Sequence, residues 1–571
     1  MWWATVSRST MTKGQGDSDG IDAFAGWAAA LDLSDVPDDV VRLAEAQVAN
    51  QLGGAFAARP SDGDALTAAI RADAADGSAT LLTGGTADPA TAIAANQTLA
   101  MLHDNDDYMF MAHAGQSAVF SSLALAEHHG RDADAFLRAV IVADELAGRL
   151  GASTLVGPHN GQMWAHVHAA ATAAATVLLA PGAEGTDAGT GSPGARAGTA
   201  GALADAVRHA LYEPVYPTEP AFMDGESKAL TAANASASGL NAGRLALGGG
   251  RGAPDALTGA HGFLDALSFL PFPEMLTGWG DSWVTRTLCV KPSPGCAYMQ
   301  APMQAYREAT GDRDLGPDDV AAIDVGASLP TVVMEAVSRP HRSTGRVTPV
   351  NATFSVPYSL AAGIVAGEYD DGALSREAID DDLTALHQVA ERVALDHDWS
   401  HTAALFDGVA EALDARAMLG ARGRLETLRG LRTFREEHAR VSTAREAWKL
   451  VSGGHLRAVV GALRPAERWP EPDLRHADFD AMRFDFGASV TVETRDGEEL
   501  SAKVRAHDGA CGDTVEERRG VAERKLKRAV SPPAYREAAE DLAAVAMDLE
   551  GRALGELGDA IAEAADEFPD G

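Results

Sequence analysis

Apolar residues recur at helical spacing through most of the first half of the chain. The pattern runs through IDAFAGWAAALDLSDVPDDVVRLAEAQVANQLGGAFAA with a break at Pro37, and continues through ADPATAIAANQTLAMLH, SAVFSSLALAEHHG and DADAFLRAVIVADELAGRLG. In the last stretch, Glu145 and Arg149 form an i,i+4 pair on one face. Alanine dominates these stretches, which permits close packing of one helix on another. The pattern predicts a large helical domain.

The sequence pattern changes near Trp283, where β-branched residues begin to alternate or cluster. VAAIDVGAS and FDFGASVTVETRDGEELSAKVRA are typical of strands, and Asp496-Gly497 predicts a tight turn within the second. Helical stretches such as VPYSLAAGIVAGEY lie between them, so this region is predicted to be α+β. The glycine-rich segment at about 181–201 is interpreted as a flexible surface insertion. The chain ends in one or two amphipathic helices.

Composition and charge narrow the class of protein. The chain has 571 residues, enough for two to four domains, and 46% hydrophobic residues give it material for a sizeable core. With 82 acidic and 47 basic residues, its net charge is −35, which disfavours binding to nucleic acid or to anionic membranes. Acid spread along the whole chain, with little lysine, resembles proteins adapted to high salt. Lysines on a functional surface would therefore stand out.

Signals for metal binding, export or membrane insertion are weak. The three cysteines, Cys289, Cys296 and Cys511, lack the spacing of a zinc finger or a disulfide framework. The start of the chain has no long apolar segment, and no run approaches 18 apolar residues free of charge. We expect a soluble, cytoplasmic protein, in which the first ten residues precede a true start at Met11.

The stretch HDNDDYMFMAHAG is the first candidate for chemistry. Asp104, Asp106 and Asp107 could bind calcium, but the EF-hand pattern fails because Gly115 occupies the position of its closing glutamate. An exposed acidic loop is the plain alternative. Four large side chains at 108–111 follow the aspartates, which indicates that the loop is tucked into protein. A carboxylate buried in this way requires a partner.

Four further residues stand in settings that suit catalysis or anion binding. His159 follows a Gly-Pro turn before a helix and could carry a proton. Lys228 precedes an alanine-rich helix whose N-terminus would favour an anion, although a solvated surface lysine is the alternative. Lys291 is flanked by prolines that would hold it rigidly. Tyr358 follows a proline at a predicted helix start.

These segments occur in an order that resembles the MmgE/PrpD family of 2-methylcitrate dehydratases and cis-aconitate decarboxylases. The similar segments are FAGWAAALDLSDVPDDVVRLAEAQVANQLGG, AANQTLAMLHDNDD, HAGQSAVFSSLALAEHHG, AVIVADELAGRLG, GPHNGQMWAHVHAAATAAATVLL, SKALTAANASASG, VKPSPGCAYMQAPMQA and ATFSVPYSLAAG. The resemblance implies a mostly α fold, with a large all-helical domain formed by both chain ends and an inserted, smaller α+β lid domain. It implies an extension at 1–20, a helical domain at 21–284, a lid at 285–524 with a helical insertion at about 400–480, and returning helices at 525–571.

The resemblance also implies a homodimer that acts on a small polycarboxylate without a metal or other cofactor. Matched residue by residue, the catalytic positions are Asp104, His113, His159, Lys228, Lys291 and Tyr358. The substrate-pocket positions are Tyr108, Asn160 and Cys296.

Several substitutions in the pocket leave the substrate open. Tyr108 stands where decarboxylase relatives have threonine, Cys296 stands where they have histidine, and Asn160 replaces a small hydroxyl residue. The ordered Asp/His/His/Lys/Lys/Tyr set, without a metal-ligand cluster, favours a lyase: a cofactor-independent hydro-lyase that dehydrates 2-methylcitrate or a similar acid in propionate metabolism. The alternatives are a decarboxylase or epimerase of a related polycarboxylate such as cis-aconitate, or a non-catalytic relative that binds a carboxylate.

Overall fold

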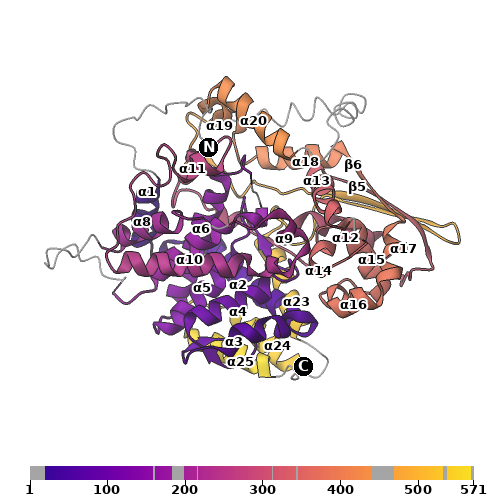
Figure 1. The fold of residues 1–571 in the computed structure, drawn as a ribbon, viewed down its shortest axis with the longest axis horizontal. Helices are drawn as coiled ribbons and strands as arrows, with labels where there is room; N and C mark the ends of the chain where they lie inside the picture. The colour runs from indigo at the N-terminus through magenta and orange to yellow at the C-terminus, as the bar shows by residue number, and fades with distance from the viewer. Residues whose placement is uncertain are drawn as a thin grey trace, which may run out of the picture.

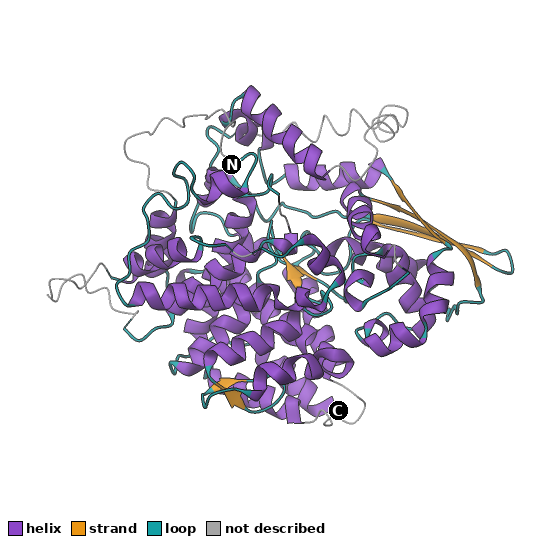
Figure 2. Cartoon of the chain, viewed as in Figure 1, coloured by secondary structure: helices purple, strands orange, loops and turns teal. Residues whose placement is uncertain are grey.

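Helices make up most of the molecule, and the predicted mostly α fold is confirmed (Figure 2). The computed structural model describes residues 20–158, 161–182, 198–214, 216–311, 313–342, 345–438, 469–530 and 536–566. Nearly all of the expected extension at 1–20, most of the glycine-rich segment at 181–201, and residues 439–468 of the expected insertion at 400–480 lie outside these ranges.

Helices from both ends of the sequence share one apolar core, which we call the helical body. Its early helices are α1 (Ile21–Ala30), α2 (Asp38–Ala58), α3 (Asp64–Ala72), α4 (Pro89–Met101), α5 (Gly115–His128), α6 (Ala133–Ser153), α7 (Ala165–Leu178), α8 (Thr199–Ala210), α10 (Leu230–Leu247) and α11 (Phe263–Leu267). Its late helices are α23 (Val515–Val530), α24 (Arg536–Ala546) and α25 (Leu554–Asp566). Helix α9 (Glu219–Asp224) lies between α8 and α10 in sequence, but its Phe222 and Met223 belong to a second apolar core, around the small sheet.

Small residues let the helices of this body pack closely. Helix α10 lies directly against α7. A Cβ atom at Gly239 would come within 2.2 Å of the carbonyl oxygen of Ala169, and one at Gly243 within 2.5 Å of the Cβ atom of Thr176. Any larger residue at either glycine would push the two helices apart. The glycines and alanines of these helices therefore set the distance between them.

The chain returns to the helical body with α23, which packs along α2 (Figure 1). The contact is close, because a Cβ atom at Gly53 would lie 3.1 Å from the Cα atom of Leu526. The boundary expected between 524 and 525 falls inside this helix. This helix is rich in charged residues and carries few apolar ones, and the domain boundary itself stays a prediction.

Most of the residues between these two parts pack around a small sheet, and we call this part the sheet region. Its strands are β5 (Val320–Ala327), β6 (Val393–His397), β7 (Ala488–Thr494) and β8 (Glu499–Val504), in the order β6-β5-β7-β8. The helices that pack around the sheet are α12 (Ala297–Thr310), α13 (Leu329–Ser338), α14 (Pro349–Ala352), α15 (Val356–Ala366), α16 (Arg376–Asp381) and α17 (Leu383–Ala390). The helices α18 (Trp399–Ala410), α19 (Ala415–Ala421) and α20 (Arg424–His438) follow in sequence, and apolar residues of α18 and α19 pack in a separate core with Tyr108, Phe110 and Leu270.

The predicted hairpin is confirmed, and it projects at one edge of the molecule (Figure 2). Strands β7 and β8 pair antiparallel around a turn in which Gly497 has φ 88°, a conformation that glycine adopts without strain. Strand β5 pairs antiparallel with β7 and parallel with β6. The hydrophobic pattern does not predict β6, because four of its five residues are exposed or partly exposed.

A buried ion pair ties helix α6 to the segment that leads into the sheet region. Glu145 and Arg149, predicted to share a face, are both buried and paired. Arg149 donates to the carbonyl oxygens of Thr277 (3.0 Å) and Ser282 (2.9 Å), while Glu145 accepts from the backbone N–H of Thr285 (2.9 Å). These bonds fix residues 277–285, which precede the short strand β4 (Cys289–Val290).

Candidate active site

The acidic loop after α4 is buried, so the alternative of an exposed charged loop is wrong. Asp104, Asp106 and Asp107 are each at most 1% exposed. The loop lies on helix α2, where a Cβ atom at Gly54 would come within 2.1 Å of the carbonyl oxygen of Asn105. Asp104 has φ 56°, a left-handed conformation that aspartate tolerates better than most residues. Contact with α2 thus fixes the path of the loop.

A two-stranded ribbon brings Lys291 to this loop. Strand β3 (Asp107–Tyr108) pairs antiparallel with β4 (Cys289–Val290), and Lys291 comes directly after β4. Its Nζ atom donates to the carbonyl oxygen of Asp104 at 2.9 Å and forms an ion pair with the carboxylate of Asp106. The ribbon is therefore the element that joins residues nearly 200 positions apart in the sequence.

Lys228 reaches the same loop from the turn before α10. Its side chain is fully buried, pairs with Asp104, and donates to the carbonyl oxygen of Met101 at 3.0 Å. The Nζ atom also lies 5.7 Å from the ring centroids of Phe222 and Phe354, at a distance that suits a cation–π contact. The alternative of a solvated surface lysine is therefore wrong.

Asp106 is the centre of the cluster. One carboxylate oxygen pairs with Lys291, and the other accepts from Gln116 Nε2 at 2.9 Å and lies 3.3 Å from His113 Nδ1. Burial opposes ionisation of Asp106, but Lys291 and His113 outweigh it and hold its pKa well below the ordinary value. Asp106 is thus a permanent anion that joins a lysine to a histidine.

His113 is the most exposed side chain of this set, at 13%. Its Nδ1 faces Asp106, so the opposite ring nitrogen, Nε2, points away from the carboxylate. The ring of Tyr108 lies beside it, with centroids 5.7 Å apart. His168 is buried nearby and bonds Ser117 Oγ (3.0 Å); burial and the charge of His113 lower its pKa to about 3, so it stays neutral.

Asp107 faces away from the lysines and is held by helix α2. It accepts from Gln51 Nε2 at 2.6 Å, Gln47 Nε2 at 3.2 Å and Asn50 Nδ2 at 3.3 Å. Burial and the neighbouring charge of Asp106 raise the pKa of Asp107 to about 6. The second and third aspartates of the motif therefore have different tasks, since one carries charge and the other anchors the loop.

Four other residues were predicted to line the site: Tyr108, Cys296, His159 and Asn160. The hydroxyl of Tyr108 lies 2.9 Å from His507 Nε2. Cys296 is buried at the start of α12, where burial and the charge of Asp104 raise the pKa of its thiol to about 12. His159 and Asn160 lie outside the described residues.

Tyr358 contacts a different set of groups, all from the sheet region. Its hydroxyl lies 2.8 Å from His387 Nδ1, and the guanidinium of Arg342 lies 5.2 Å from its ring centroid. Within the described chain, no hydrogen bond or ion pair joins Tyr358 to the buried cluster. The structure thus brings together four of the six predicted catalytic residues: Asp104, His113, Lys228 and Lys291.

Two charged residues of the cluster are not predicted from the sequence. Lys525 of α23 donates to the carbonyl oxygen of Asn105 at 2.6 Å and to Asn50 Oδ1 at 2.7 Å. Asp371 accepts from Asn105 Nδ2 at 2.8 Å and lies 3.0 Å from His103 Nδ1. Neither residue stands in a recognisable motif. Lys525, in addition, is one of many charged residues on α23. Only a conserved charge in an alignment could have pointed to them.

The described residues contain no group of three or more His, Cys, Asp or Glu side chains arranged to hold a metal ion. The aspartates of the loop are instead paired with lysines and amides. Within the same residues, no helix is both long and apolar enough to cross a membrane.

Comparison with protein families identifies a model that matches part of the chain. Residues 22–273 match the family model of the MmgE/PrpD N-terminal domain. This range contains Asp104, His113 and Lys228, and it ends before Lys291. No curated protein matches the chain.

Proposed function

Through residues 22–273 the chain belongs to the MmgE/PrpD family, and from this premise we propose that it is a hydro-lyase that removes water from 2-methylcitrate or a similar hydroxy acid, without a cofactor. Family membership supports the coarser statement, a dehydratase- or decarboxylase-type activity on a carboxylate substrate. The finer assignment rests on the chemistry that the buried cluster can perform.

Elimination of water next to a carboxylate needs a base for the C–H proton and an acid for the departing hydroxyl. His113 is suited to carry a proton, because it is the cluster member that reaches the surface and its Nε2 points away from Asp106. Asp106 accepts a bond from Nδ1 and stabilises the imidazolium that forms when Nε2 takes up a proton. In this proposal His113 is the base, and Asp106 is the residue that positions it.

Negative charge grows on the substrate carboxylate as the proton leaves, and fixed cations stabilise it. Lys291 is joined to His113 through Asp106, and Lys228 is held through Asp104. Because each lysine is already ion-paired and buried, it keeps one position and needs little reorganisation during the reaction. The cluster therefore supplies proton transfer and positive charge side by side.

The bridge from Lys291 through Asp106 to His113 is the observation that carries this proposal. The test is to incubate the purified protein in high salt with 2-methylcitrate and a chelator, and to follow absorbance of the conjugated C=C bond. We expect turnover in the unmodified protein and a loss of about 10²–10⁴-fold in His113→Asn. His261→Asn, a matched change at a 63% exposed histidine, should retain full activity.

Several results would contradict the proposal. No product, or product only after addition of iron, would exclude cofactor-independent dehydration. Release of carbon dioxide from cis-aconitate would assign a decarboxylase instead, and solvent deuterium incorporation without elimination would assign an epimerase. Thermal stabilisation by polycarboxylates with no turnover of any of them would indicate a non-catalytic binding protein.

A further inference from the structure

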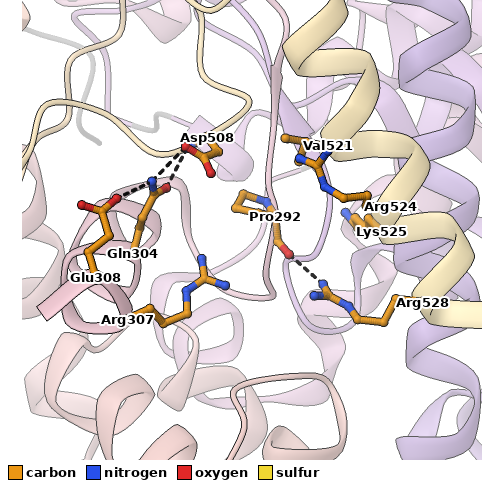
Figure 3. Close-up of a pocket in the computed structure, with 9 residues that line it drawn as sticks. All are labelled: Pro292, Gln304, Arg307, Glu308, Asp508, Val521, Arg524, Lys525 and Arg528. Atoms are coloured by element: carbon orange, nitrogen blue, oxygen red, sulfur yellow. Dashed lines mark hydrogen bonds between the residues drawn. The ribbon is translucent and has the colours of Figure 1, made fainter. Parts of the chain in front are cut away.

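A cavity of about 330 Å³ opens between the helical body and the sheet region, and the residues that line it do not include His113. Figure 3 shows these lining residues. Helix α12 lines one side with Arg307, and helix α23 lines the other with Arg524, Lys525 and Arg528. Pro292 lies between them. The volume falls in the range of small-ligand sites, at its lower end.

The cavity is unusually basic for this protein. Four cations line it, against two carboxylates, Glu308 and Asp508, in a chain whose net charge is −35. Both carboxylates accept hydrogen bonds from Gln304 Nε2, at 3.0 and 2.9 Å. Gln304 thus occupies one face of each carboxylate and holds both at the edge of the cavity.

The arginines of the cavity have little to bind within the protein. The guanidinium groups of Arg307 and Arg524 form no hydrogen bond or ion pair with any described residue, and Arg528 donates to the carbonyl oxygen of Pro292 at 2.8 Å. Arg307 and Arg528 approach the same space from opposite sides (Figure 3). Burial, together with the charge of Arg528, lowers the pKa of Arg307, although the charges of Asp508, Glu308 and Glu368 act in the opposite direction. An anion between them would relieve this repulsion.

Two hydrogen bonds connect the cavity to the catalytic cluster. Lys525 lines the cavity and donates to the carbonyl oxygen of Asn105, which lies between Asp104 and Asp106. Arg528 holds the carbonyl oxygen of Pro292, the residue after Lys291. The cavity therefore touches the backbone on both sides of the Lys291–Asp106 ion pair.

We propose that this cavity is a second anion site, which takes a small oxyanion of charge −2 or more and steadies the catalytic loop through Lys525. Guanidinium groups bind carboxylate and phosphate oxygens with paired hydrogen bonds, and two of them facing one space suit a multiply charged oxyanion better than chloride. Burial lowers the pKa of Lys525 to about 7, so a nearby anion would favour its charged form and strengthen its bond to Asn105. These contacts are the same whatever reaction the cluster catalyses.

The first test measures binding to the full-length protein by calorimetry. Sodium phosphate and sodium succinate are titrated separately, at ionic strength held constant with sodium chloride. We expect one anion bound per chain, and affinity weakened at least about 10-fold in the double variant R307Q R528Q. R552Q, a change at a partly exposed arginine of the helical body that does not line the cavity, should bind as the unmodified protein does. Preference for phosphate would indicate a phosphate-bearing ligand, and preference for succinate a polycarboxylate.

Binding by neither anion, or unchanged affinity in R307Q R528Q, would overturn the site. Because the catalytic cluster also contains cations, Lys228→Gln is titrated in parallel. Affinity lost in that variant and kept in R307Q R528Q would place the anion at the cluster and overturn the site as well.

The second test measures the coupling by hydrogen exchange of the amides in residues 103–108. In the unmodified protein, we expect the exchange of these amides to slow as phosphate or succinate is added, with a midpoint at the measured Kd. In R307Q R528Q, we expect addition of the same anions to leave the exchange unchanged. Anion binding with no change in the exchange of these amides would refute the connection through Lys525.

Discussion

Replacing Asp107 by asparagine should stabilise the protein at neutral pH. The carboxyl of Asp107 is buried, and burial together with the charge of Asp106 raises its pKa from the ordinary 3.8 to about 6. The side chains that donate hydrogen bonds to it are amides. The folded protein therefore prefers Asp107 protonated, and ionisation of this group weakens the fold. Asparagine keeps the size of the side chain and remains neutral at every pH.

The magnitude follows from the difference in pKa between the folded and unfolded states. A carboxyl with a raised folded-state pKa destabilises the fold increasingly as pH rises from 3.8 to about 6, and the loss then stays constant. This shift corresponds to about 3 kcal/mol at pH 7 or above, of which roughly half develops between pH 5 and pH 7. The side-chain oxygens of Gln47 and Gln51 have no hydrogen-bond partner among the described residues, so either amide can turn to accept from the asparagine that replaces Asp107.

The assay is urea-induced unfolding of Asp107→Asn and the unmodified protein, followed by tryptophan fluorescence at pH 5, 6, 7 and 8. Other titrating groups are common to both proteins and cancel in the difference between their free energies of unfolding. Asp318→Asn, at an exposed aspartate, should change stability by less than about 0.5 kcal/mol. A difference that does not grow between pH 5 and pH 7, or a variant less stable than the unmodified protein at pH 8, would refute this prediction.

Four other predictions follow from the packing and the ion pairs. Lys228→Met should lower the free energy of unfolding, measured by urea titration, by about 3–5 kcal/mol, because it leaves Asp104 charged and buried. Adding Asp104→Asn should recover part of this loss. Arg149→Met should cost a similar amount by the same measurement, since it also removes the bonds that hold residues 277–285. Gly54→Ala should displace the catalytic loop, lower stability by about 1–3 kcal/mol and reduce turnover, as seen by urea titration and activity assay. Light scattering coupled to size exclusion should give twice the mass of one chain, as expected for a homodimer; a single-chain mass would contradict that expectation.

Much of the fold follows from local sequence. The 3.6-residue pattern of apolar positions defines helices such as α6, and alternation around Asp496-Gly497 defines the hairpin of β7 and β8. These signals are local because a helix or a hairpin satisfies its backbone hydrogen bonds within a few residues of sequence. Strand β6 was not predicted, because its partner β5 is distant in sequence and its own side chains are mostly exposed.

The candidate site was predicted in part. Asp104, His113, Lys228 and Lys291 stand in segments that resemble the family, and the packed chain brings them together. Tyr358 matched a motif equally well, yet its contacts are with Arg342 and His387. A motif places a residue on an element but does not determine which way that element turns once it is packed.

By itself, the sequence determined a mostly helical protein with a buried acidic loop, similar through residues 22–273 to the MmgE/PrpD N-terminal domain. The tertiary structure alone decided which charges meet: Asp106 became the centre, Asp107 became an anchor, and Lys525 reached Asn105 from 420 residues away. The physical reason is that removing a charge from water is costly, so each buried charge must find its partner wherever packing brings one. That choice depends on distances through space, which the order of residues along the chain does not contain.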